Sequence, residues 1–162
     1  MNYESINKIT DILENLPRNS IGGKKVDINW IDLSEIKYNL KLPLEYRWFI
    51  ENYDFVVLWG EPTKTVFPPE YQDDADQDIF NYHELDSEEP QIENKLVFLV
   101  TEEGEEYYFP IKDYQAQKEV FLHDPKNELD EFYSEDFLEF LLKEIPKNYY
   151  RNLCTNKHTK VH

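Results

Sequence analysis

Carboxylates are the side chains best placed to do chemistry in this sequence, because they gather in one stretch. Residues 65–94 contain ten acids and neither lysine nor arginine. The acids are Glu70, Asp73, Asp74, Asp76, Asp78, Glu84, Asp86, Glu88, Glu89 and Glu93. A cluster of one sign repels nucleic acid and anionic membrane, and it attracts a cation or a basic protein. The stretch therefore predicts a protein-binding role, with nucleic acid and membrane excluded as partners.

The spacing of Asp74, Asp76 and Asp78 matches the opening of a calcium-binding EF-hand loop. The rest of the loop does not fit, because Ile79 stands at the glycine position and Leu85 at the position of the bidentate glutamate. We therefore expect no resident metal and no cofactor. A looser divalent-ion site stays open, since any carboxylate cluster attracts cations.

No combination of residues predicts an enzyme. Acids are so abundant that a glycosidase-like pair would arise by chance. The single cysteine, Cys154, lies in a polar segment near the end and is expected to be a bystander thiol. His83 lies among the acids, where it is either a plain surface residue or a pH-sensitive contact. Gly22 and Gly23 lack the flanking pattern of a phosphate-binding loop.

Length and composition predict one folded domain. The chain has 162 residues, a net charge of -17 and an aromatic fraction of 15%. Those aromatic residues can supply a core despite the charge. We expect a single domain over residues 1–150 and a flexible tail over residues 151–162. The first residues show no signal peptide, and no apolar run approaches the ~20 residues of a membrane helix. The expected location is the cytoplasm.

Apolar residues at helical spacing predict three helices. The first covers residues 3–16 and ends before Pro17, and the second covers residues 42–53. The third runs from Ser134, which suits an N-cap, to Pro146.

Short β-branched and aromatic runs predict the strands. They cover residues 55–59, 95–101, 106–111 and 119–123. Residues 95–101 are apolar on both faces and are expected to be central in the sheet, with a hairpin turn at residues 102–105. Residues 26–33 are expected to form a short strand or an irregular arm. The order predicts an α+β fold, in which helices from the N- and C-terminal parts pack around an antiparallel sheet.

Three aromatic residues, Tyr71, Phe80 and Tyr82, interleave with the acids. They either anchor the stretch to the sheet or act as hot spots for a partner. The predicted partner-binding residues are Asp73, Asp74, Asp76, Asp78, Phe80, Tyr82, Glu84, Asp86, Glu88 and Glu89.

This arrangement resembles the SUKH superfamily, one branch of which is related to a yeast cell-wall synthesis regulator. The resemblance covers residues 3–146 and is carried by three segments. Residues 42–53 are similar to the family's Leu-Pro helix, residues 96–109 to its hairpin, and residues 119–141 to its last strand and C-terminal helix. Many members have an Asn-Gly-Gly-like turn after the second helix. Here Asp54 and Phe55 follow that helix, so its exit must differ and the subfamily stays open.

The resemblance implies an immunity protein that binds and neutralises a polymorphic toxin, often a nuclease. A nuclease presents a basic groove for phosphates, which clustered carboxylates can occupy. The family has no catalytic residues to transfer, so the chain is not expected to be an enzyme. The alternative is a regulatory or scaffold module of the same fold without toxin inhibition.

Overall fold

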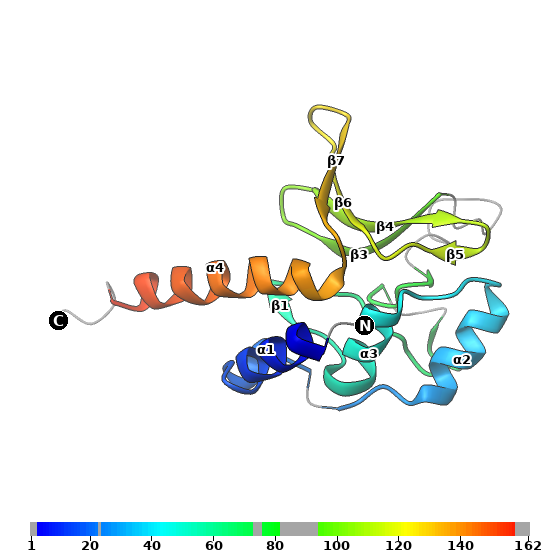
Figure 1. Ribbon diagram of the computed structural model, residues 1–162, viewed down its shortest axis with the longest axis horizontal. Helices are drawn as coiled ribbons and strands as arrows, with labels where there is room; N and C mark the ends of the chain where they lie inside the picture. The colour runs from blue at the N-terminus through cyan, green and yellow to red at the C-terminus, as the bar shows by residue number, and fades with distance from the viewer. Residues whose placement is uncertain (1–2, 23, 73–75, 82–93, 158–162) are drawn as a thin grey trace.

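The computed structural model describes residues 3–22, 24–72, 76–81 and 94–157, and the side chains of residues 149–157 are not considered. The helical elements are α1 Tyr3–Glu14, the 3-10 turn η1 Arg18–Ser20, α2 Ile28–Lys37, α3 Leu44–Tyr53 and α4 Phe137–Lys157. The strands are β1 Val57–Leu58, β2 Glu61–Pro62, β3 Lys95–Val100, β4 Glu106–Lys112, β5 Gln115–Ala116, β6 Val120–Asp124 and β7 Leu129–Ser134. Figure 1 shows the main sheet on one side of the helices, with the β6–β7 hairpin projecting away from them.

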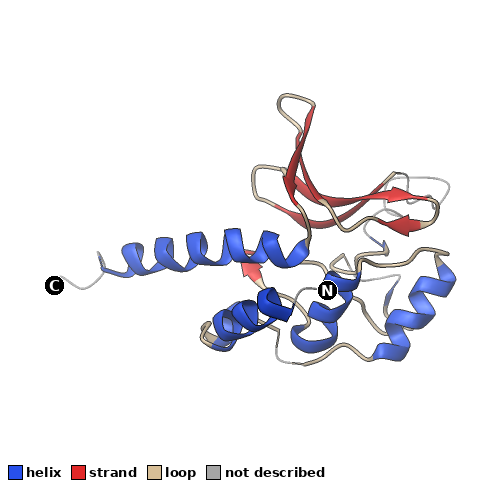
Figure 2. Cartoon of the chain, in the orientation of Figure 1, coloured by secondary structure: helices blue, strands red, loops and turns tan. Residues whose placement is uncertain are grey.

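The main sheet is antiparallel in every strand pair, in the order β3-β4-β6-β7, with β5 paired to β4. This confirms the predicted α+β fold, and Figure 2 shows the main sheet and the helices on separate sides. The predicted central position of residues 95–101 is wrong, because β3 lies at the end of the strand order. It is nevertheless apolar on both faces, since Phe98 joins the core while Val97 is buried outside that cluster. The backbone N–H of Lys64 donates to the Phe98 carbonyl (2.7 Å), which covers part of this edge.

Helix α2 replaces the strand or arm expected at residues 26–33. Asp27 caps it by accepting a hydrogen bond from the Asn29 N–H at 2.8 Å. The helix buries Ile31 but leaves Leu33 and Ile36 exposed. Because apolar residues lie on both sides of the helix, its sequence lacks the one-sided periodicity that predicts a helix.

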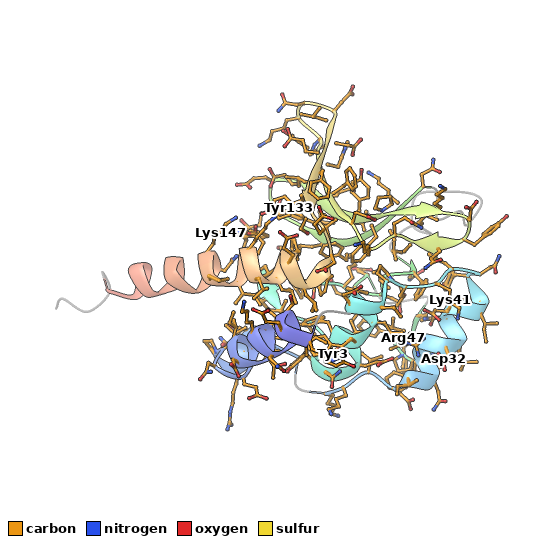
Figure 3. The ribbon with its side chains drawn as sticks, viewed as in Figure 1. Tyr3, Asp32, Lys41, Arg47, Tyr133 and Lys147 are labelled. Carbon is orange, nitrogen blue, oxygen red and sulfur yellow. The ribbon has the colours of Figure 1, made fainter. Side chains whose placement is uncertain are left out.

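Ion pairs fasten α2 to α3. Arg47 on α3 reaches Asp32 (2.8 Å) and Glu35 (3.1 Å) on α2, and Lys41 also contacts Glu35 (2.6 Å; Figure 3). Glu35 is buried and accepts a further bond from the Leu42 N–H at 2.9 Å. A buried carboxylate is tolerated when it is paired in this way, so these contacts fix where α3 begins.

Helix α4 starts later and ends later than predicted. Ser134 ends strand β7, and the carboxylate of Asp136 instead accepts from the Glu139 N–H (2.9 Å) as an N-cap. Pro146 lies inside the helix, which continues to Lys157. A proline removes one helical hydrogen bond, and here the chain stays helical beyond it. The segment expected to be a tail, residues 151–162, is therefore helical as far as Lys157. The division of the chain into a domain and a tail stays a prediction.

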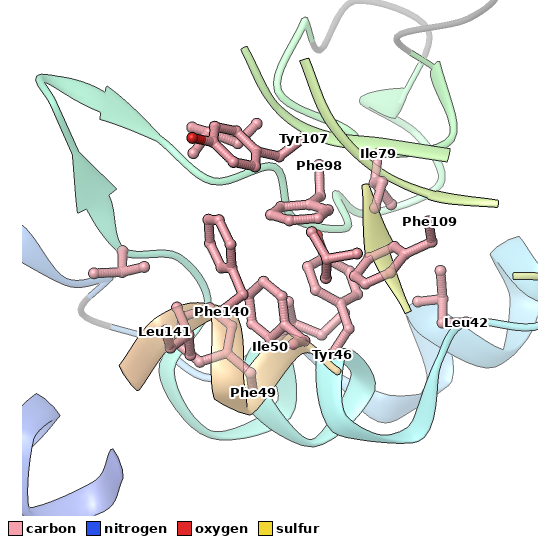
Figure 4. Close-up of a cluster of buried hydrophobic side chains, with 14 of the residues drawn as sticks. Leu42, Tyr46, Phe49, Ile50, Ile79, Phe98, Tyr107, Phe109, Phe140 and Leu141 are labelled. Atoms are coloured by element: carbon pink, nitrogen blue, oxygen red, sulfur yellow. The ribbon is translucent and has the colours of Figure 1, made fainter. Parts of the chain in front are cut away.

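An aromatic cluster joins α3, α4 and the sheet. The ring of Phe98 lies 4.7 Å from that of Phe109, 5.2 Å from Phe137 and 5.0 Å from Phe140, measured between centroids. Figure 4 shows these rings meeting Tyr46 and Phe49 of α3. The side chains of Phe49 and Phe140 are both fully buried. The rings prefer edge-to-face and offset contacts, and both occur here.

Replacing Phe98 by alanine is expected to lower the free energy of unfolding by ~3–5 kcal/mol, because it opens a cavity among rings that cannot close around it. Phe132→Ala is the matched control, since that side chain is 53% exposed. Urea denaturation of both variants measures the difference. Equal losses in the two variants would contradict the central position of Phe98.

Candidate functional site

The acidic segment falls partly outside the part of the chain that the structure describes. Of the predicted partner-binding residues, seven lie outside it: Asp73, Asp74, Tyr82, Glu84, Asp86, Glu88 and Glu89. Asp76, Asp78 and Phe80 are described, and of these three only Asp76 is exposed. Most of the predicted surface therefore stays a prediction. Two of its residues, Asp78 and Phe80, have a different role in the structure.

Asp78 is a buried structural carboxylate. One of its oxygens accepts from the N–H groups of Phe80 (2.8 Å) and Asn81 (3.2 Å). The other accepts from the Phe67 N–H (2.8 Å) and the Gln72 side-chain amide (3.3 Å). Burial raises the pKa of Asp78, and these hydrogen bonds oppose that rise. The prediction that Asp78 contacts a partner is therefore wrong, because its side chain is enclosed by the segment it organises.

Phe80 is an anchor rather than an interface residue. Its side chain is fully buried and stacks on Tyr38, with the ring centroids 5.1 Å apart and the planes 12° apart. Of the two roles left open for this aromatic residue, the structure supports anchoring. Its predicted contact with a partner does not fit this burial.

Replacing Asp78 by asparagine is expected to lower the free energy of unfolding by ~1–3 kcal/mol. The amide nitrogen cannot accept the bonds that one carboxylate oxygen now accepts, so buried donors lose their acceptor. Asp76→Asn is the control, because that side chain is exposed. Thermal or urea unfolding of both variants measures the effect, and an unchanged stability of the Asp78 variant would refute the anchoring role.

A second acidic site lies at the turn between β3 and β4. The turn between β1 and β2, the turn between β3 and β4, η1 and α4 line a partly open cavity of about 630 Å³, called the Trp59 cavity below. Its acids are Glu102, Glu103 and Glu105, all from one turn, and its aromatic residues are Trp59 and Tyr107. Residues 102–105 were expected only to form a hairpin turn, and three acids within these four residues were a signal of this site in the sequence.

Stacked rings form the aromatic wall of this cavity. The rings of Trp59 and Tyr107 lie 5.7 Å apart with planes at 11°. Tyr107 also contacts Phe140 at 5.1 Å, so the wall is continuous with the core (Figure 4). Burial raises the pKa of the Tyr107 hydroxyl, and the charges of Glu144 and Glu105 raise it further. The hydroxyl therefore stays neutral and can both donate and accept a hydrogen bond.

Trp59 occupies a strained backbone position. Leu58 pairs with Glu61, so Trp59 and Gly60 form a two-residue turn. Their φ angles are +52° and +90°, a combination for which Asn-Gly is the usual sequence. A bulky residue with positive φ is uncommon. The side-chain oxygen of Asn148 on α4 accepts from the Trp59 N–H at 2.6 Å and holds the turn. The fold thus tolerates strain to place this ring beside the three acids.

We expect Trp59→Gly to be more stable than Trp59→Ala by about 1 kcal/mol. Both variants lose the ring, but only glycine is relieved of the strain at positive φ. Leu33 supplies the control pair, because it is exposed inside helix α2, where alanine should be favoured over glycine by a similar amount. Chemical denaturation of the four variants tests this. The same order of stability at both positions would contradict the strain at Trp59.

The described residues offer no site for a bound metal, since no three His, Cys, Asp or Glu side chains among them are grouped to hold one. Within the same residues, every helix is too short or too polar to cross a membrane. The chemistry of the Trp59 cavity is therefore that of carboxylates, a phenol and an indole.

Comparison with known proteins identifies the family of the chain. No curated protein matches the chain. A family described as SMI1-KNR4 cell-wall, SUKH_6, matches residues 28–141. That range runs from α2 to the first part of α4, and it includes Trp59 and the turn at 102–105. Because the match extends over more than half of its length, the chain belongs to the SMI1-KNR4 family SUKH_6, within the SUKH superfamily.

Proposed function

We propose that the chain is a cytoplasmic immunity protein that binds and neutralises a cognate toxin, with a basic nuclease domain as its target. The SUKH family is generally a non-enzymatic immunity or regulatory fold, and membership is consistent with this role. The observation that carries the proposal is the Trp59 cavity, where three acids of one turn lie beside a strained tryptophan.

Charge supports a basic target. A nuclease domain needs a positive groove to hold phosphates, and a partner of net charge -17 is attracted to such a groove over long distances. Attraction of this kind raises the association rate more than it raises the final affinity. The exposed acid Asp76 and the predicted acids of residues 73–89 outside the described residues remain part of the proposed surface.

The composition of the cavity favours binding over turnover. The residues that line it in the described part of the chain include no His, Cys, Lys or Arg. The hydroxyl of Thr101, which could be a weak nucleophile, accepts a hydrogen bond from the Glu105 N–H at 3.2 Å. Among the lining residues, only the carboxylates could act as a base toward the Thr101 hydroxyl at neutral pH. Such a cavity recognises positive charge more readily than it performs a reaction.

Neutralisation is tested by co-expressing the chain with the toxin domain encoded beside its gene and measuring growth. Complex formation is measured by stopped-flow kinetics at two salt concentrations. We expect the association rate to fall steeply with salt, because the Debye length shrinks from ~10 Å at 0.1 M to ~3 Å at 1 M. The dissociation rate should change less.

Two matched variants separate the site from the total charge. The cavity variant replaces Glu102, Glu103 and Glu105 by glutamine, and the control variant replaces the exposed acids Glu14, Glu131 and Glu135. Both lose the same charge, but only the cavity variant should weaken rescue and slow association strongly. Full rescue by the cavity variant would contradict the site. An absence of rescue by the unchanged chain would favour a regulatory or scaffold module instead.

A further inference from the structure

We infer that the Trp59 cavity receives an arginine side chain of the protein partner. The identity of the partner as a toxin rests on the proposed function, whereas the chemistry of the ligand follows from the cavity itself. Three independent properties support a guanidinium group: uncompensated negative charge, an unused hydroxyl and a flat aromatic wall.

The negative charge of the cavity is not neutralised within the described chain. Glu102 and Glu103 are exposed and Glu105 is half-buried. Among the described residues, none of these three acids takes part in an ion pair. The cavity lining adds no cation. By contrast, the buried acids Glu35 and Glu144 are each paired with a basic side chain. The cavity therefore attracts a positive group from outside.

The hydroxyl of Tyr107 points to a hydrogen-bonding ligand. Its side chain is only 5% exposed, and it lines the cavity. Within the described part of the chain the structure shows no hydrogen bond to this hydroxyl, whereas Tyr46 donates to the Lys64 carbonyl at 2.6 Å and Tyr108 to Asp130 at 3.0 Å. Although the side chain is mostly buried, the hydroxyl oxygen itself is not closed off and is accessible from the cavity. The Tyr107 hydroxyl thus offers an acceptor to a donor that enters the cavity.

The aromatic wall distinguishes arginine from lysine. Trp59 stacks on Tyr107 with planes at 11°, so the phenol ring supports one face of the half-buried indole and the opposite face is the one on which a ligand can stack. A planar guanidinium stacks on such a surface and directs five N–H donors at surrounding acceptors. A lysine ammonium is a compact, strongly hydrated charge that gains less from stacking. The carboxylates and the phenol that line the cavity can each accept a hydrogen bond from a guanidinium N–H.

The probe is the tripeptide acetyl-Gly-Arg-Gly-amide, titrated into the 15N-labelled full-length chain. The chain has three tryptophans, so the indole N–H signal of Trp59 is followed and those of Trp30 and Trp48 serve as internal references. Trp59→Phe assigns the signal. We expect a saturable shift of the Trp59 signal with a dissociation constant of millimolar order, as befits one side chain. The lysine peptide should bind at least about threefold more weakly.

The peptide in which citrulline replaces arginine is the decisive control, because it keeps the shape and loses the charge. It should give no saturable shift. In the cavity variant of Glu102, Glu103 and Glu105, arginine binding should fall about tenfold or more, while the control variant should bind as the unchanged chain does. Thermal unfolding of each variant verifies that it is folded.

Equal shifts with arginine and citrulline, or a Trp59 signal that does not move, would overturn the arginine site. Those results would not decide the proposed function, which the growth test measures separately. Conversely, arginine binding without toxin neutralisation would refute the immunity role and retain the site. The two failures are therefore distinguishable.

Discussion

The packing of α4 against the sheet through aromatic rings is the interaction on which the rest of this structure depends. Phe137 and Phe140 of α4 contact Phe98 of β3, and Phe140 continues the contact to Tyr107 of β4. Tyr107 in turn supports Trp59. Because rigid rings transmit position well, the core fixes the aromatic wall of the cavity directly. Asn148, two residues beyond Pro146 on the same helix, holds the Trp59 backbone and completes this arrangement.

Acids serve two separate purposes in the chain. Asp78 and Glu35 are buried, accept several hydrogen bonds each and organise the segments around them. Glu102 and Glu103 are exposed and unpaired within the described residues, so their charge is directed outwards. A buried carboxylate contributes only when its bonds are satisfied, whereas an exposed one acts through its field. Composition alone does not separate these two groups, since the residues are chemically the same.

The parts of the fold with a clear apolar pattern, one-sided in a helix or continuous in a buried strand, could be predicted from the sequence. Helix α3 and the hairpin of β3 and β4 follow the expected patterns. Helix α2 could not, because its apolar residues face both the core and the exterior. Strand β7 was missed because Asp130 and Glu131 interrupt its apolar pattern and its side chains are largely exposed. The composition of the Trp59 cavity could not be predicted from the sequence. Residues 59, 102–107 and 148 are far apart along the chain and meet only when α4 packs on the sheet.

In the proposed binding surface, the turn of residues 102–105 and the turn of Trp59 and Gly60 act together. Hydrogen–deuterium exchange of the chain, alone and in complex with the proposed toxin partner, is the most direct test, because amides at an interface exchange more slowly. We expect slower amide exchange over residues 57–62 and 101–107 in the complex, and unchanged exchange in the projecting hairpin of residues 124–134. Protection confined to that hairpin or to α2, with residues 57–62 and 101–107 unaffected, would contradict this binding surface.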